Sequence, residues 1–242
     1  MPHRTIFASP HLAFFRYFWY VYSAAIAEHE LLLAVVVKRD DRHPGCIPVG
    51  STREERAKQG KSVAEPAQSS LIDLFVARAT EAAAKVERVP RSASDVRAAI
   101  VRATEGARSL VVADGDLLPA EIFNAARSLP GVIAKPSDDQ LSTADAGVTE
   151  AFAGIARSGS ICIAMGPPLR ATTSLLMPLH VALLPAFRIV ARPRDLFEPS
   201  GIGAEAMRRN LIIVTGPSAT ADMGPLVRGV HGPHRLHILV LE

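Results

Sequence analysis

Cysteine is scarce in this sequence, and its scarcity limits the cofactors that the chain could hold by itself. There are 2 Cys among 242 residues, Cys46 and Cys162, and neither belongs to a CxxC pair. Two thiols are too few for an iron–sulfur cluster or a zinc site that needs four cysteines. A disulfide framework is not expected in a chain of this length either. We therefore expect two free thiols in a reducing cytoplasm, and no cofactor in this chain.

Long apolar runs and basic clusters are lacking as well. The apolar run at residues 12–27 is shorter than the roughly 18–20 residues that a membrane span needs, and it contains Arg16. The 27 Lys and Arg residues are interleaved with 24 Asp and Glu, whereas nucleic-acid-binding proteins usually cluster basic residues on one face. We expect no nucleic-acid partner, and membrane association through residues 12–27 is the weakest alternative.

The first 68 residues differ from the rest of the chain. All three Tyr, the only Trp and four of the nine Phe lie within residues 1–22, whereas residues 38–68 are polar and broken by Pro and Gly. We predict an aromatic-rich helix followed by a polar linker in residues 1–68, and one α/β domain in residues 69–242. An upstream stretch preceding a wrongly assigned start is the alternative for the first segment.

From Ser69 onwards, helical periodicity alternates with short apolar runs. This pattern is typical of a largely parallel sheet covered on both faces. Ser70 with Asp73 and Ser94 are candidate helix caps. Strands are expected at 86–89, 109–114, 132–134, 160–165, 180–185, 188–191, 211–214 and 237–241, and helices at 69–86, 92–107, 118–131, 149–159 and 193–198.

The loop TGPSATAD follows the run LIIV, and ligands of such sheets bind beyond the carboxyl ends of strands. Gly216 can adopt a positive φ, and Ser218 or Thr220 can cap a helix that begins near Ala221. Backbone N–H groups there would favour an anion, although Asp222 opposes it. The alternative is that these polar side chains only cap the helix.

The segment GVHGP places His231 between two glycines, where a neutral imidazole could act as a general acid or base. The alternative is a histidine that only hydrogen-bonds a neighbouring loop. His231, His234 and His237 have the spacing HxxHxxH, but a glycine and a proline interrupt it, so we expect no metal site.

Two further stretches carry hydroxyl groups. Ser158, Gly159 and Ser160 form a turn between a predicted helix and strand, for which a glycine C-cap is a sufficient explanation. Residues 165–174 are expected to form a loop, from which Arg170 offers a cation to an acidic substrate or is simply solvated. The sequence contains no GxGxxG, Walker A or GxSxG motif.

The stretch TGPSATADMGPLVRGVHGPHRLHILVL resembles the C-terminal signature of the lactate-utilisation (LUD) domain family. The stretches GVTEAFAGIARSGSICIA and LMPLHVALLPAFRIV are similar to the same family, and the resemblance covers about residues 69–242. One departure is Arg157, which stands where the family usually has an acidic residue before this turn.

The resemblance implies a three-layer α/β sandwich with a mostly parallel sheet, similar to the glucosamine-phosphate deaminase and ribose-phosphate isomerase fold. It also implies a part in oxidising L-lactate to pyruvate beside iron–sulfur partner proteins, either in assembly or in binding a small anion. The alternative is a stand-alone enzyme acting on a phosphorylated or carboxylated molecule. The expected catalytic residues are His231 and Asp222, and the expected ligand-binding residues are Thr215, Gly216, Ser218, Thr220, Gly229, Gly232, Ser158, Gly159 and Ser160.

Overall fold

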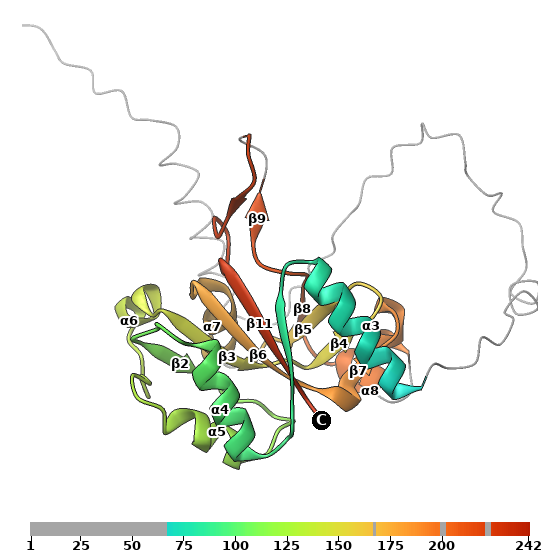
Figure 1. Ribbon diagram of the computed structural model, residues 1–242, viewed down its shortest axis with the longest axis horizontal. Helices are drawn as coiled ribbons and strands as arrows, with labels where there is room; N and C mark the ends of the chain where they lie inside the picture. Colours follow the sequence, from blue (N-terminus) through green and yellow to red (C-terminus); the bar gives the residue numbers. More distant parts are fainter. Residues whose placement is uncertain (1–66, 167, 199–201, 221–223) are drawn as a thin grey trace, which may run out of the picture. The chain divides into compact units, whose positions relative to one another are not determined.

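Figure 1 shows the computed structural model, which describes residues 67–166, 168–198, 202–220 and 224–242. The predicted aromatic-rich helix and almost all of the predicted linker lie outside the described residues, so the division at residue 68 stays a prediction. None of the helices in the described ranges is long and apolar enough to cross a membrane.

A five-stranded parallel sheet forms the centre of the described domain. Its strands lie in the order β1 (Lys85–Val89), β11 (Arg235–Leu241), β6 (Leu179–Pro185), β3 (Ala146–Glu150) and β2 (Leu110–Val112). Every neighbouring pair is parallel. The prediction of an α/β fold with a mostly parallel sheet is therefore confirmed.

Successive residues of β11 point to opposite faces of this sheet, as the two-residue period of a strand requires. Leu239 and Leu241 pack with the helices α4 (Ala93–Ala103) and α5 (Ala120–Arg127) on one face. Ile238 and Val240 pack on the other face. Because both faces are buried, the strands are apolar along their whole length, which is what made them recognisable in the sequence.

The second face is covered by α3 (Gln68–Glu81) and by a smaller sheet (Figure 1). That sheet has the order β7 (Ile189–Val190), β4 (Ala153–Ile155), β5 (Ser160–Ala164) and β8 (Leu211–Val214). The central strand β5 is antiparallel to both β4 and β8.

The remaining described elements are short and lie in the connections between strands. They are α6 (Asp138–Thr143), α7 (Pro168–Leu176), η1 (Ala186–Arg188), η2 (Pro193–Phe197), α8 (Ile202–Ala206), β9 (Ala219–Thr220) and β10 (Val227–Arg228).

The predicted helix at 149–159 is wrong, because these residues end β3, form β4 and begin the turn to β5. Gly154 shows why a strand is required. A side-chain carbon there would lie 2.9 Å from Leu184 and 3.1 Å from Phe75, so the backbone passes close to both. This tertiary packing overrides a local helical pattern.

Four smaller predictions are also wrong. Residues 132–134 form an isolated bridge from Val132 to Leu110 rather than a strand, and most of the predicted loop at 165–174 belongs to α7. Ser70 lies inside α3 and donates to the carbonyl of Ala67, so it makes no capping box. The N-cap of α4 is Ser92, not Ser94.

Candidate functional site

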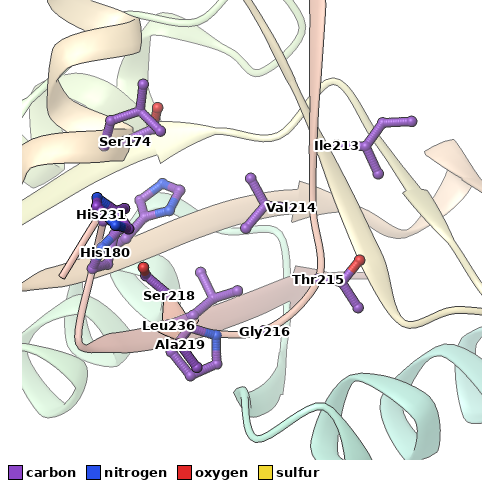
Figure 2. Close-up of a pocket in the computed structure, with 14 residues that line it drawn as sticks. Ser174, His180, Ile213, Val214, Thr215, Gly216, Ser218, Ala219, His231 and Leu236 are labelled. Carbon is purple, nitrogen blue, oxygen red and sulfur yellow. The ribbon is translucent and has the colours of Figure 1, made fainter. Parts of the chain in front are cut away.

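A pocket of about 410 Å³ lies where the chain leaves β8 and passes the amino ends of β6 and β11. It is lined by Thr215, Gly216, Ser218, His231 and Gly232, which were all predicted as site residues. In Figure 2 the side chains of Thr215 and His231 lie towards opposite ends of the pocket. The two loops that the sequence pattern singled out therefore line one pocket.

The pocket lies at a different edge of the parallel sheet from the one expected to bind ligands. The loop after β8 does follow the carboxyl end of a strand, but β8 belongs to the smaller sheet. In the parallel sheet the pocket touches His180 and Leu236, each the second residue of its strand. The site thus lies at the amino ends of the parallel strands rather than at their carboxyl ends.

Backbone hydrogen bonds hold the two loops together. The N–H of Ser218 donates to the carbonyl of Pro233 at 2.9 Å, and the N–H of Gly229 donates to the carbonyl of Ser218 at 2.9 Å. Ala219 and Thr220 form β9, which pairs with β10 in a hairpin. Ala219 and Thr220 are thus part of a strand, and the helix start predicted near residue 221 lies outside the described residues.

Two glycines allow this close approach of the loops. Gly216 has φ +70°, and a side-chain carbon there would lie 2.0 Å from the carbonyl oxygen of Ala82. Gly229 has φ +80°, and a side-chain carbon there would meet the ring of His234. Gly229 does not itself line the pocket, and neither does Thr220, so both predicted residues belong to the supporting hairpin.

His180 is a member of the site that sequence analysis missed. Its side chain is completely buried, and its Nε2 lies 2.8 Å from the hydroxyl oxygen of Thr149. Burial lowers the pKa of His180 to about 4, so the imidazole is neutral at physiological pH. Its Nδ1 has no hydrogen-bond partner among the described residues. The only sequence signal was a histidine inside an otherwise apolar strand.

His231 lines the same pocket, and its side chain is exposed. Asp222, its predicted partner, lies outside the described residues. Within the described part of the chain, no Asp, Glu, Lys or Arg lines this pocket, and no three His, Cys, Asp or Glu side chains lie close enough to hold a metal ion. The pocket therefore offers hydroxyl, imidazole and backbone groups to a small polar molecule.

The predicted turn at Ser158, Gly159 and Ser160 is connected to this pocket without lining it. The hydroxyls of Ser158 and Ser160 lie 2.7 Å apart, and that of Ser160 lies 2.7 Å from the hydroxyl of Thr215. Gly159 packs against α3, where a side-chain carbon would lie 2.2 Å from the backbone nitrogen of Ala79. Three hydroxyls in a row thus join this turn to Thr215.

The family model described as the LUD domain matches residues 72–241. The chain belongs to the LUD domain family. Its similarity to individual proteins is moderate. It is 34% identical over 98 residues to an uncharacterized protein of Neisseria meningitidis serogroup B, which covers 40% of this chain and 42% of that protein.

Other relatives carry the name lactate utilization protein C. The protein of Halalkalibacterium halodurans is 32% identical over 109 residues, covering 43% of this chain and 47% of that protein. The protein of Deinococcus radiodurans is 29% identical over 153 residues, covering 62% of this chain and 70% of that protein. The chain thus spans less than half the length of the Neisseria and Halalkalibacterium relatives.

A crystal structure of a DUF162 family protein from Deinococcus radiodurans has the same fold. Its TM-score is 0.55 at 23% identity, and the match covers 73% of this chain and 99% of that one. This likeness supports the α/β architecture of the LUD domain. The specific similarity to glucosamine-phosphate deaminase and ribose-phosphate isomerase stays a prediction.

A cluster of charged side chains lies at the opposite edge of the parallel sheet, at the carboxyl ends of β2 and β3. Arg170 was expected in a solvated loop, but it is 3% exposed within α7. Its guanidinium donates to the carbonyl of Asp114 at 2.9 Å and to the carboxylate of Asp116 at 3.2 and 3.3 Å. Arg170 and Arg209 together lower the pKa of Asp116.

Glu150 ends β3 beside this cluster and is 4% exposed. Its carboxylate accepts the backbone N–H groups of Asp116, Leu117 and Leu118, at 2.6 to 3.1 Å. Burial nevertheless raises the pKa of Glu150. These backbone hydrogen bonds and the ion pair of Arg170 with Asp116 fix the loop after β2, so the hydroxyl-lined pocket is the candidate site.

Proposed function

We propose that this LUD domain takes part in cytoplasmic L-lactate utilisation as a subunit without its own redox cofactor, and that it binds a small hydroxy acid or a similar anion. The observation that carries the proposal is the pocket in which Ser218 and His231 meet over the buried His180. The names of the relatives from Halalkalibacterium and Deinococcus support lactate utilisation as the process.

The pocket's chemistry is consistent with such a ligand. The hydroxyls of Ser174, Thr215 and Ser218 can hydrogen-bond carboxylate and hydroxyl oxygens, and the exposed imidazole of His231 can add a positive charge when it is protonated. Oxidation of lactate to pyruvate removes two electrons and two protons. We assign the electrons to iron–sulfur partner proteins, because the two cysteines of this chain cannot supply the four ligands of a cluster.

A second candidate function is a stand-alone enzyme on a phosphorylated or carboxylated small molecule. The exposure of His231 within the pocket favours it, since an exposed imidazole can exchange protons with a ligand. In this hypothesis His231 is the general acid or base, and Asp222 orients it.

Purification from cells tests the first candidate against the second. Tagged protein is recovered from lactate-grown cells, and the eluate is assayed for iron and for lactate oxidation. Iron and activity that co-purify support the subunit, whereas an eluate with neither contradicts it and favours the stand-alone enzyme. The His231→Ala variant should retain iron and lose activity if His231 contacts the ligand rather than the partner proteins.

Ligand binding is tested separately by thermal unfolding with L-lactate, phosphate or nucleotides. A molecule that binds only the folded state raises stability with the logarithm of its excess over Kd. We expect lactate to stabilise the wild type and not His231→Ala. The matched control is His234→Ala, which removes an exposed histidine that does not line the pocket. No stabilisation of the wild type by any of these molecules would contradict both candidates.

A further inference from the structure

A second hollow, of about 590 Å³, is lined by Arg157, Ser158, Arg192, Pro193 and Arg194. It shares no lining residue with the pocket described above. Arg157 and Ser158 belong to the turn between β4 and β5, and the other three residues belong to the segment that follows β7. Three guanidinium groups are thus collected from two separate parts of the chain.

Strand pairing places two of these arginines next to each other. β4 and β7 are parallel, with Ile155 opposite Val190. The pairing continues beyond the strands, because the N–H of Arg157 donates to the carbonyl of Ala191 at 3.1 Å. Arg157 and Arg192 therefore lie next to each other, just beyond the same ends of β4 and β7. Like charges on neighbouring strands repel each other and destabilise the pair.

No carboxylate among the described residues forms an ion pair with Arg157 or Arg192, in contrast to Arg170 and Arg209. Asp195 is the carboxylate beside the hollow. It accepts the backbone N–H of Arg192 at 2.8 Å and lies 3.6 Å from the Nε of Arg194. Three positive charges against this one negative charge leave about two positive charges without compensation.

We propose that this hollow binds the phosphate or pyrophosphate group of a small molecule. A phosphate monoester carries a charge of about −1.5 to −2 at neutral pH, which matches the uncompensated charge. Guanidinium groups present paired N–H donors that fit phosphate oxygens. The Ser158 hydroxyl, which lies 2.7 Å from that of Ser160, can donate a further hydrogen bond to the ligand while it accepts one from Ser160.

The hydroxyl groups of Ser158, Ser160 and Thr215 connect the two hollows. Ser158 lines the arginine hollow, Thr215 lines the other pocket, and Ser160 lies between them at 2.7 Å from each. The two sites differ in charge and should therefore bind different ligands. A dianion matches the arginine hollow, whereas the other pocket has no Lys or Arg among its described lining residues.

Isothermal titration with pyrophosphate, at an ionic strength held constant with KCl, tests the proposal. We expect Arg157→Gln and Arg192→Gln each to weaken binding about tenfold or more, and the double variant to abolish it. Arg208→Gln is the matched control, because Arg208 is exposed, does not line the hollow and forms no ion pair among the described residues. No binding by the wild type, or equal affinity in Arg157→Gln, would overturn the proposal.

Thermal unfolding separates loss of binding from loss of folding. Without pyrophosphate, Arg157→Gln and Arg192→Gln should be at least as stable as the wild type, because each removes the repulsion between the two arginines. With pyrophosphate, the wild type and Arg208→Gln should gain stability, Arg157→Gln and Arg192→Gln should gain less, and the double variant should gain none. A gain that persists in the double variant would place the anion elsewhere and overturn the proposal. The result is independent of lactate binding, which neither substitution should change.

Discussion

The Nε2 of His180 lies 2.8 Å from the hydroxyl oxygen of Thr149, and both side chains are completely buried between neighbouring strands of the parallel sheet. The Thr149 hydroxyl is the only hydrogen-bond partner of this ring among the described residues, because the Nδ1 has none. A charged imidazole would therefore lack solvation, and the ring at the edge of the candidate pocket is held neutral.

This burial predicts a loss of stability in mild acid. His180 and His237 both have a folded-state pKa of about 4, lowered mainly by burial from an ordinary value of 6.5. Between these values the unfolded chain takes up protons that the folded protein does not. The contribution of these histidines to the free energy of unfolding should therefore be fully present above pH 6.5. It should fall as the pH drops towards 4, by about 2 kcal/mol per histidine at pH 5.

Urea denaturation of the wild type and of His237→Gln at pH 7.5 and pH 5 measures this effect. The variant should lose about 2 kcal/mol less than the wild type between the two pH values, whatever its stability at pH 7.5. An identical loss in both proteins would show that burial of His237 does not set its pKa.

Gly216 should tolerate no side chain, because its backbone passes close to Ala82. Gly106 serves as a control, because it shares the positive φ but has free space around it. Gly216 and Gly106 have similar positive φ values, +70° and +84°, but a side-chain carbon would clash only at Gly216. We expect Gly106→Ala to cost about 1 kcal/mol from backbone strain, and Gly216→Ala about 2–4 kcal/mol. Chemical denaturation measures both, and equal costs would contradict the close approach to Ala82.

Arg170 should matter more for stability than its neighbour Arg209. Both bind Asp116, but the Arg170 side chain is 4% exposed and the Arg209 side chain 26%. Arg170→Met leaves the Asp114 carbonyl without this donor, so we expect a cost of about 2–3 kcal/mol and a smaller one for Arg209→Met. If urea denaturation showed a larger cost for Arg209→Met than for Arg170→Met, the more exposed ion pair would be the more important one.

His231 should affect function without affecting folding. Its side chain is exposed and makes no hydrogen bond within the described residues, so His231→Ala should change the free energy of unfolding by no more than about 0.5 kcal/mol. Lactate-dependent stabilisation should disappear in the same variant. A loss of several kcal/mol in urea would instead assign His231 to the structure of the loop. The corresponding prediction for Asp222→Ala stays open to the same measurement.

The sequence allowed the parallel sheet to be predicted because its strands are buried on both faces and are therefore continuously apolar. It misled at 149–159, where small residues permit a helix locally and only the contacts of Gly154 with Leu184 and Phe75 require a strand. In the smaller sheet, β5, β7 and β8 were predicted as strands, but β4 and the separation of these strands from the parallel sheet were missed.

The candidate site could be predicted only in part. The loops of Ser218 and His231 stood out because glycine and proline surround polar side chains there. His180 did not, because it sits in an apolar strand, and which strand end faces a given loop is a property of topology. Arg170 was expected to be solvated because the sequence shows its charge but not the aspartates from another loop that surround it.

The place of β11 in the sheet has a consequence for synthesis. This strand comes last in the described chain, yet it lies between β1 and β6, which pair with it on either side. While the ribosome is still translating it, β1 has no neighbour in the sheet, and the apolar faces on both sides of the gap are open to solvent. Until β11 is in place, the domain therefore exposes unpaired strand edges, which make a folding intermediate prone to aggregation.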